Sequence, residues 1–185
     1  MKDNALTIIA CGSSAATNLP AYLTGLAGAV DLELRVLLTP SAGRFIQPQV
    51  VAWYADEVIG SDDPALNPAE LAGRSIGIVV LPATANMVAA AALGLAAGPA
   101  QTTLLAAPDP ALFFPSMNPS MWAKGTTQRH VAALRAEGHT VVEPLEQRMY
   151  EIWRRDFTTG PALPPPHVAT ETIIEWLEKR LNAEP

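Results

Sequence analysis

The chain has 185 residues, of which 49% are hydrophobic and only 16% are charged, and its formal net charge at pH 7 is −6. This length suits one α/β domain with a sizeable core, expected to span residues 1–185. The negative charge and the lack of a basic stripe in the sequence argue against a nucleic-acid partner. The longest apolar stretch, residues 87–97, is too short to cross a membrane, so no membrane insertion is expected.

Cysteine and histidine usage gives little support for a disulfide or a metal site. Cys11 is the only cysteine, which excludes an internal disulfide framework and a multi-cysteine metal site and makes a cytoplasmic location the default expectation. The three histidines, His130, His139 and His167, lack ligand spacing, so no metal site is predicted. Buried subunit contacts would explain the high apolar fraction, which predicts a homo-oligomer.

Short apolar runs alternate with helical segments along the whole chain. This alternation predicts a doubly wound parallel α/β sheet, Rossmann- or flavodoxin-like, built as a three-layer sandwich. Strands are expected at residues 6–10, 33–38, 76–80, 111–114 and 139–143, with a further strand, or a short helix and a strand, within 50–60. Helices are expected to start or kink at Pro20, to open at Asn67, and to cover residues 87–97, 98–107, 126–137 and 170–181.

The loop after the first expected strand, residues 11–14, has the composition of an anion site. Gly12 lets the backbone turn tightly, and Ser13 and Ser14 offer hydroxyls and backbone amides at a helix N-terminus. The segment lacks the GxGxxG pattern, so a dinucleotide fingerprint is not supported, and a plain strand-to-helix turn is the alternative. After the second strand, Thr39 is a natural helix N-cap.

Two polar loops, each with an asparagine, follow the strands expected at 76–80 and 111–114; they are Pro82-Ala83-Thr84-Ala85-Asn86-Met87 and Pro115-Ser116-Met117-Asn118-Pro119-Ser120-Met121-Trp122. Ligands of an open parallel sheet bind beyond the carboxyl ends of its strands, so these loops are expected to build one site from two sides. Pro82 is expected to end its strand and Asn86 to cap the following helix. The amide of Asn118 can hold a carboxylate or a carbonyl without bringing a charge. Ordinary strand-to-helix connections with an N-cap asparagine are an equally weighted alternative.

These two loops resemble the signature motifs of the homo-oligomeric flavin-containing cysteine decarboxylases, which run roughly Pro-Ala-Ser-Ala-Asn-Thr and Pro-x-Met-Asn-x-x-Met-Trp. The chain has Thr84 and Met87 in place of the serine and the threonine of the first motif. The second motif is complete at Pro115, Met117, Asn118, Met121 and Trp122. The resemblance covers about residues 5–144. The family includes phosphopantothenoylcysteine decarboxylases and enzymes that oxidatively decarboxylate the C-terminal cysteine of lanthipeptide and linaridin precursors.

The resemblance implies a cofactor, FMN rather than FAD, bound at a subunit interface of a homotrimer or of a dodecamer of trimers. The loop after the first strand would hold phosphate or ribityl oxygens, the hydroxyl of Ser41 would meet the FMN phosphate, and Phe45 would lie beside the isoalloxazine ring. The residues implied as cofactor ligands are Gly12, Ser13, Ser14, Thr39, Ser41, Phe45, Pro82, Ala83, Thr84, Ala85, Asn86 and Met117.

The resemblance also implies a reaction, the oxidative decarboxylation of the C-terminal cysteine of a ribosomally made precursor peptide to an aminoenethiol, for aminovinyl-cysteine formation. The flavin would supply the redox chemistry, Asn118 would bind the carboxylate, and Met121 would shape the pocket. The family usually has a histidine base where this chain has Asn67, whose amide cannot exchange a proton near neutral pH. Either another group deprotonates the substrate thiol, or no base is needed.

Residues 144–168 match no family pattern, and their proline-rich sequence is expected to form a mobile substrate lid or a linker before a C-terminal helix at 169–185. Arg148, Arg154 and Arg155 could grip a peptide carboxylate there, although surface charge is the commoner role. Phosphopantothenoylcysteine decarboxylases carry an Ala-Cys-Gly segment in this region, and its absence here favours the oxidative peptide reaction. The alternatives left open are a phosphopantothenoylcysteine decarboxylase, a related flavin prenyltransferase, and a non-catalytic flavin-binding regulatory subunit.

Overall fold

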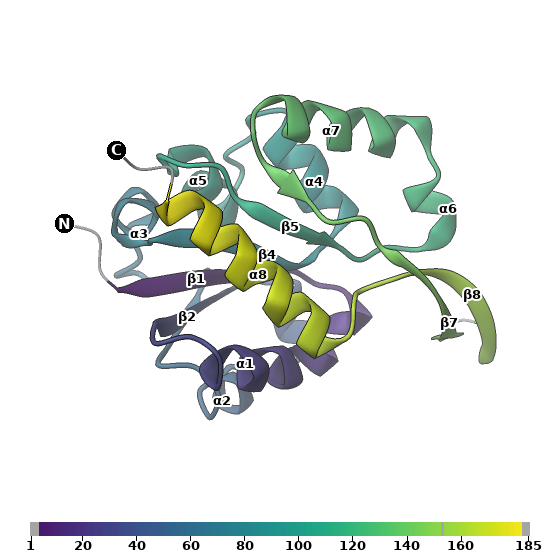
Figure 1. Ribbon diagram of the computed structural model, residues 1–185, viewed down its shortest axis with the longest axis horizontal. Coiled ribbons are helices and arrows are strands. Elements are labelled where there is room, and N and C mark those ends of the chain that lie inside the picture. Colours follow the sequence, from purple (N-terminus) through teal and green to yellow (C-terminus); the bar gives the residue numbers. More distant parts are fainter. Residues whose placement is uncertain (1–3, 153, 183–185) are drawn as a thin grey trace.

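The computed structural model describes residues 4–152 and 154–182, and its centre is a six-stranded sheet (Figure 1). The strands are β1 (Ala5–Ala10), β2 (Glu33–Leu38), β3 (Glu57–Gly60), β4 (Gly77–Ala83), β5 (Leu112–Pro115) and β6 (Thr140–Val141). They lie in the order β3-β2-β1-β4-β5-β6, and every neighbouring pair is parallel. With helices on both faces, this is the doubly wound α/β fold that the sequence predicts.

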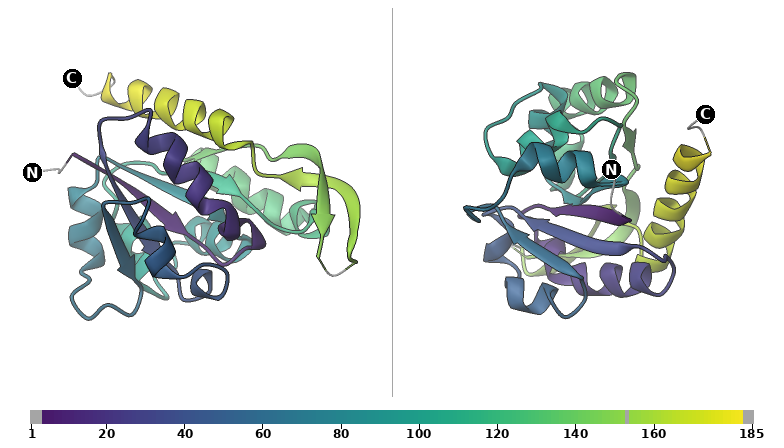
Figure 2. Two further views of the ribbon diagram at one scale, coloured as in Figure 1. Left: turned by 90° about the horizontal axis from the view of Figure 1, so that it is seen from below. Right: turned by 90° about the vertical axis from the view of Figure 1, so that its left-hand side faces the viewer.

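Two helical layers cover the sheet, as Figure 2 shows. One layer consists of α1 (Leu19–Ala27), α2 (Pro48–Val51) and α8 (Pro166–Leu181). The opposite layer consists of α3 (Pro68–Arg74), α4 (Ala85–Ala92), α5 (Pro99–Ala106) and α7 (Gly125–Ala136). The short helices that follow β1, β2 and β5 at the carboxyl edge of the sheet are η1 (Ser14–Asn18), η2 (Ala42–Arg44) and α6 (Pro119–Trp122).

The apolar character of β1 follows from its place in the middle of the sheet, where all of its residues are buried. Leu6 and Ile8 belong to the apolar cluster beneath α1 and α8, whereas Ile9 belongs to the cluster beneath α3, α4, α5 and α7. A strand covered on both faces has to be apolar at almost every position, so its sequence is a continuous apolar run. Burying each such leucine or isoleucine side chain contributes roughly 1.5–3 kcal/mol.

The carboxyl ends of the central strands carry the loops that the sequence singles out. The order of the strands reverses between β1 and β4, and ligands of doubly wound sheets bind at such a point. The backbone N–H of Cys11 donates to the carbonyl of Pro82 at 3.1 Å, and the N–H of Ser116 donates to the carbonyl of Ala83 at 2.8 Å. The loops after β1, β4 and β5 are therefore joined at one edge of the sheet.

Two expectations about the end of β4 are wrong. Pro82 does not end the strand, which continues to Ala83, where the pairing with β5 resumes after a shift in register. A proline is tolerated there because the ladder is irregular. The cap of α4 is Thr84 rather than Asn86, since the Thr84 hydroxyl accepts the N–H of Met87 at 3.4 Å. Asn86 lies instead in the first turn of the helix.

Three further boundaries differ from the expectation or lie beyond the structure. α4 ends at Ala92, several residues earlier than predicted, because Gly94 adopts the left-handed conformation with φ of 62°. η2 begins at Ala42 rather than directly after Thr39, although the Thr39 hydroxyl still accepts the N–H of Ala42 at 3.3 Å. Residues 183–185 of the predicted terminal helix lie outside the described residues.

The segment expected to be a lid or a linker contains an antiparallel hairpin of β7 (Leu145–Glu151) and β8 (Asp156–Ala162). β6 is therefore not the last strand of the chain. The hairpin projects beyond the carboxyl ends of the sheet strands (Figures 1 and 2). Trp153, inside the predicted lid, lies outside the described residues.

Gly77→Ala is expected to lower the free energy of unfolding by roughly 1–3 kcal/mol. A Cβ on Gly77 would lie 2.9 Å from Cζ3 of Trp176 and 3.2 Å from Cδ2 of Leu177, so the added methyl group would push α8 away from β4. Urea unfolding followed by circular dichroism measures the change.

Gly73→Ala is the matched control because a Cβ there would meet no neighbouring heavy atom within 4 Å. Gly73 lies inside α3, so alanine is expected to stabilise the protein by up to about 1 kcal/mol. A Gly77→Ala variant as stable as the wild type would contradict the close packing of α8 on β4.

Candidate functional site

The loops after β1 and β2 are in direct contact, and the contact requires a glycine. A Cβ on Gly12 would lie 2.5 Å from the Cβ of Ser41 and 2.6 Å from the Ser41 carbonyl oxygen. Thr39 is held beside them, since its hydroxyl donates to the carbonyl of Ala10 at 3.0 Å and lies 3.2 Å from the Ser41 hydroxyl. The structure thus brings together three of the predicted cofactor residues, Gly12, Thr39 and Ser41.

A second contact joins the loop after β1 to the loop after β5. The hydroxyls of Ser13 and Ser116 are hydrogen bonded at 2.7 Å, although the two residues are 103 positions apart. The Ser13 oxygen also accepts the N–H of Ala15 at 3.3 Å, so it caps η1. The predicted anion loop therefore lies beside the loop that carries Asn118.

The direction of the Asn118 amide is fixed by its neighbours. Its Oδ1 accepts the backbone N–H of Ser120 at 2.9 Å and the Ser120 hydroxyl at 2.7 Å. A backbone N–H can only donate, so the amide oxygen faces Ser120 and the Nδ2 group faces the other way. Nδ2 donates there to Oε1 of Glu151, at the end of β7, at 3.2 Å. The Nδ2 group of Asn118 is therefore a hydrogen-bond donor of fixed direction, and the Glu151 carboxylate accepts its hydrogen bond.

Two cavities lie at this edge of the sheet, and both have the size of a small-molecule site. One, of about 530 Å³, lies between the loops after β1 and β5 and the hairpin; four predicted residues line it, namely Ser13, Ser14, Met117 and Asn118. The other, of about 410 Å³, is lined by four more, namely Thr39, Ser41, Thr84 and Asn86. Two larger cavities, of about 670 Å³ and 660 Å³, contain none of the predicted site residues, so we do not assign the site to them.

Several predicted residues line neither of these two cavities. Pro82 and Ala83 are buried in β4, and Ala85 is the first residue of α4. These three residues therefore fix the course of the backbone on either side of Thr84. Phe45 and Met121 are 39% and 45% exposed. An exposed aromatic or thioether side chain is available to a ligand or to a second subunit, and the contribution of both residues to the site stays a prediction.

Asn67 lies apart from both cavities. Its Oδ1 accepts the N–H of Glu70 at 3.2 Å, so the residue caps α3, which begins where the sequence predicts a helix to open. It lines a separate cavity of about 150 Å³ together with Arg35 and Glu57. Within one chain the structure does not bring Asn67 to the Asn118 cavity, so a joint role of the two residues would need a second subunit.

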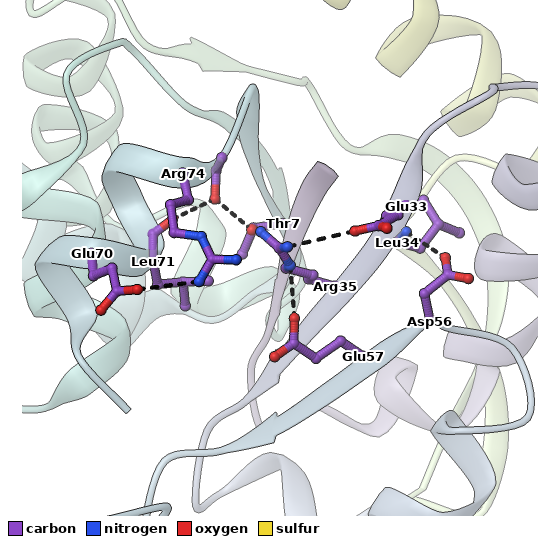
Figure 3. A network of polar contacts seen from close by, with 10 residues as sticks. Thr7, Glu33, Leu34, Arg35, Asp56, Glu57, Glu70, Leu71 and Arg74 are labelled. Carbon is purple, nitrogen blue, oxygen red and sulfur yellow. Dashed lines mark hydrogen bonds and ion pairs between the residues drawn. The ribbon is translucent and has the colours of Figure 1, made fainter. Parts of the chain in front are cut away.

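The polar side chains around that smaller cavity form a structural network (Figure 3). Nε of Arg35 lies 2.7 Å from Oε2 of Glu57, which ties β2 to the edge strand β3. Arg74 pairs with Glu70 along α3 at 3.1 Å. The Arg35 side chain is largely buried, and pairing with a carboxylate offsets the cost of removing its charge from water. These contacts give Arg35, Glu57, Glu70 and Arg74 partners within the protein.

Glu151 is the site residue that sequence reasoning missed. It lies 33 positions from Asn118, in the segment expected to be a lid, and no motif marks it. In the structure, Gln147, Met149 and Glu151 of β7 are less exposed than their neighbours, but the sequence of the strand has no matching hydrophobic alternation. Every second side chain of that strand therefore turns away from water.

The polar groups of the two cavities fit a flavin mononucleotide. The hydroxyls of Thr39, Ser41 and Thr84 and the amide of Asn86 can donate to and accept from phosphate and ribityl oxygens. The close approach of Gly12 to Ser41 keeps these loops together. A doubly wound sheet with such loops at its carboxyl edge defines the class of α/β proteins that bind nucleotides and flavins.

The chain belongs to the Flavoprotein family, whose model matches residues 1–178. It is similar to the mersacidin decarboxylase of Bacillus sp. (strain HIL-Y85/54728), with 34% identity over 155 residues, 82% of this chain and 79% of that protein. Among solved structures, it is similar to a histidine-to-asparagine variant of EpiD complexed with the substrate peptide DSYTC, with a TM-score of 0.85 and 26% identity over 96% of this chain and 99% of that one. It is also similar to SpaF, an FMN-dependent cysteine decarboxylase, with a TM-score of 0.78 and 28% identity over 95% of this chain and 96% of that one.

Within residues 4–152 and 154–182, no helix is both long and apolar enough to cross a membrane. The same ranges contain no group of three or more His, Cys, Asp or Glu side chains placed to hold a metal ion. The polar side chains of the two cavities are mainly hydroxyls and amides, together with the Glu151 carboxylate.

Cys11 is expected to resist alkylation in the folded protein. It is 1% exposed at the end of β1, and burial raises the pKa of its thiol from 9.0 to about 12, an effect that hydrogen bonding with Thr84 only partly opposes. The reactive thiolate is therefore scarce, and at about pH 8 labelling by iodoacetamide is expected to be roughly a hundredfold or more slower than in the unfolded chain. Mass spectrometry of the labelled protein measures the rate.

The same shift contributes to the pH dependence of stability. Because the folded pKa is raised above the unfolded one, the contribution of Cys11 to stability is present below about pH 9 and is lost as the pH rises toward 12.

For the alkylation experiment, labelling in denaturant is the control, since it shows that the thiol is intact. Equal labelling rates with and without denaturant would contradict the burial of Cys11.

Proposed function

We propose that the chain is an FMN-dependent peptidyl-cysteine decarboxylase, which oxidatively decarboxylates the C-terminal cysteine of a ribosomally made precursor peptide. The product is an aminoenethiol, from which aminovinyl-cysteine forms. The observation that carries the proposal is the Nδ2 group of Asn118, which lines a cavity of about 530 Å³ and already donates to a carboxylate oxygen. The names of the relatives support the same reaction, since one is a mersacidin decarboxylase and EpiD is bound to a peptide that ends in cysteine.

The Asn118 amide suits a carboxylate that has to leave. It donates a hydrogen bond without a full charge, so it orients the substrate carboxylate and stabilises its negative charge less than an arginine would. Decarboxylation removes that charge from the carboxyl group, and an interaction stronger in the ground state than in the transition state would slow the step. The contacts of Oδ1 with Ser120 set the direction of the donor before the substrate arrives.

The other walls of this cavity favour the same step. Its apolar lining consists mainly of Met117, Pro119, Met149, Ile152, Pro161 and Leu163. Apolar walls exclude water from the reacting carboxylate, and the loss of carbon dioxide disperses the charge that water would otherwise stabilise. Ser13 and Ser14 also line the cavity, so their hydroxyls are available to the peptide backbone or to the cysteine side chain.

The second cavity, of about 410 Å³, is the proposed position of polar parts of FMN. The residues proposed to bind them are Thr39, Ser41, Thr84 and Asn86. When bound, FMN supplies an acceptor for the hydride that leaves the cysteine Cβ. The residues proposed to complete the cofactor site are Gly12, Ser13, Ser14, Phe45, Pro82, Ala83, Ala85 and Met117.

The proposed reaction does not depend on a base at Asn67. A cysteine thiol with a pKa of about 8.5 is already a few per cent thiolate at neutral pH. We therefore propose that the substrate thiol ionises without proton transfer to Asn67, whose side chain caps α3. In this proposal water takes up the proton of the thiol.

Phosphopantothenoylcysteine decarboxylation is the second candidate function. By the family resemblance, that reaction calls for a thiol in the segment that here contains the hairpin. Cys11 is the only cysteine of the chain, and it is buried at the end of β1. The peptide reaction is therefore the better supported of the two. FMN binding without turnover would instead indicate the third alternative, a non-catalytic flavin-binding subunit.

We propose a homo-oligomer, a homotrimer or a dodecamer of trimers, located in the cytoplasm. The described surface exposes large apolar side chains, among them Trp53 at 75%, Leu93 at 60% and Leu105 at 58%. Contacts between subunits would remove such side chains from water. The cytoplasmic location is proposed from the single cysteine of the chain.

The protein, mixed with FMN and a short peptide that ends in cysteine, is expected to release a product lighter by carbon dioxide and two hydrogens. Mass spectrometry of the peptide measures this change. Asn118→Asp is expected to lower turnover by roughly a hundredfold or more, because a carboxylate at this position would repel the carboxylate of the substrate.

Asn182→Asp is the matched control, because the same change of charge occurs at the C-cap of α8, outside the predicted site. An unchanged peptide, with FMN bound and several cysteine-ended sequences tried, would contradict the enzymatic proposal. An equal loss of turnover in both variants would contradict the role of Asn118.

Gly12→Ala is expected to weaken FMN binding by about tenfold or more, because the added methyl group would force apart the loops after β1 and β2. Quenching of flavin fluorescence during titration measures the Kd. Gly43→Ala in η2 is the control, since a Cβ there would meet nothing within 4 Å. Similar FMN affinities of the two variants would contradict the proposed position of the cofactor.

A further inference from the structure

The hairpin of β7 and β8 is held against the Asn118 loop by two contacts. A Cβ on Gly160 of β8 would lie 2.7 Å from Cγ of Pro119, so the strand approaches this loop more closely than a larger residue would allow. At the end of β7, Oε1 of Glu151 accepts the hydrogen bond from Nδ2 of Asn118 at 3.2 Å. An isolated two-stranded hairpin is marginally stable in water, so contacts with the body of the protein determine where it lies.

Glu151 lines the cavity of about 530 Å³, and its carboxylate lies where the proposed function places the carboxylate of the substrate. Its side chain is 12% exposed, and its second oxygen, Oε2, lies 3.2 Å from Nε of Arg154. Among the described residues that line this cavity, Glu151 is the only one with an acidic side chain. The donor that the proposed function assigns to the substrate carboxylate is therefore already bonded to a carboxylate of the protein.

We propose that Glu151 competes with the substrate, its carboxylate accepting the hydrogen bond of the Asn118 amide until the C-terminal carboxylate of the peptide displaces it. The inference rests on the proposed function, because it takes Asn118 as the group that binds the substrate carboxylate. Within the site already described, the Glu151 carboxylate and the substrate carboxylate thus compete for the Nδ2 group of Asn118.

The displacement follows from charge. Nδ2 has two hydrogens, but two carboxylates bonded to one nitrogen would lie within a few ångströms of each other. Like charges at that distance repel strongly inside a protein, so Glu151 leaves Asn118 when the substrate carboxylate arrives. Arg154 pairs with Glu151 from within the turn of the hairpin, so the displaced carboxylate keeps a cation beside it.

Because a ligand has to displace Glu151 from Asn118, its binding depends on the free energy that its other contacts supply. Replacing one hydrogen bond between a carboxylate and an amide by another gains little free energy, so a small carboxylate without further contacts binds weakly. A peptide gains in addition from the apolar lining of the cavity, which includes Met149 and Ile152 of the hairpin segment. Glu151 thereby weakens the binding of every ligand that needs the Asn118 donor by a similar factor, so at low concentration a peptide binds and a small carboxylate such as free cysteine does not.

Calorimetric titration of the FMN-loaded protein tests the exchange, with a short cysteine-ended peptide and N-acetylcysteine as the two probes. Glu151→Gln keeps the size of the side chain and an oxygen that can accept from Asn118, but it removes the charge. Both probes are expected to bind this variant about tenfold more tightly than the wild type, and Glu151→Ala is expected to give at least the same gain. Glu146→Ala, at an exposed position of the same strand, is the matched control and is expected to leave both affinities unchanged.

Calorimetry needs no turnover, so the result separates the exchange from the proposed function. Tighter binding by both Glu151 variants supports the exchange, and a peptide that is bound but never decarboxylated would overturn only the enzymatic proposal. Binding by both variants that is equal to or weaker than that of the wild type, or no binding by any variant, would overturn the exchange. Turnover of the peptide by the wild type would then leave the proposed function in place.

Discussion

The fixed direction of the Asn118 amide is the constraint on which the proposed site depends. A reversed amide would turn its carbonyl oxygen toward the cavity and repel a carboxylate. Ser120 prevents this reversal, because its backbone N–H and its hydroxyl both donate to Oδ1. The orientation is thus set by the first turn of α6, and the proposed contact with the substrate carboxylate involves no charged side chain. A neutral donor of fixed direction suits a reaction in which the bound group departs as neutral carbon dioxide.

The parallel sheet places this amide where a cofactor and a peptide can meet. β4 and β5 are neighbouring parallel strands, so their loops leave the same edge, and the N–H of Ser116 donates to the carbonyl of Ala83 across them. The hydrogen bond between Ser13 and Ser116 adds the loop after β1. The contact of Gly12 with Ser41 adds the loop after β2. The cavity assigned to the peptide and the cavity assigned to FMN are therefore lined by loops that these contacts join.

Much of the sheet could be predicted from the sequence, because strands buried on both faces are continuous apolar runs; β2 has the predicted bounds, residues 33–38. The loops could be predicted because polar residues follow each run. The cap of α4 could not, since Thr84 and Asn86 are both good caps and only the backbone decides between them. The hairpin could not either, because the glycine and the prolines within residues 160–166 indicate a linker. The contact of Asn118 with Glu151 joins distant positions without any local signal.

The most direct test of this account is an experimental structure of the FMN-loaded protein with a peptide that ends in cysteine. We predict that the terminal carboxylate of the peptide accepts the hydrogen bond from Nδ2 of Asn118, that Oδ1 remains bonded to Ser120, and that Glu151 has moved off the amide. A terminal carboxylate bound elsewhere, with the hydrogen bond between Asn118 and Glu151 still in place, would contradict the central claim.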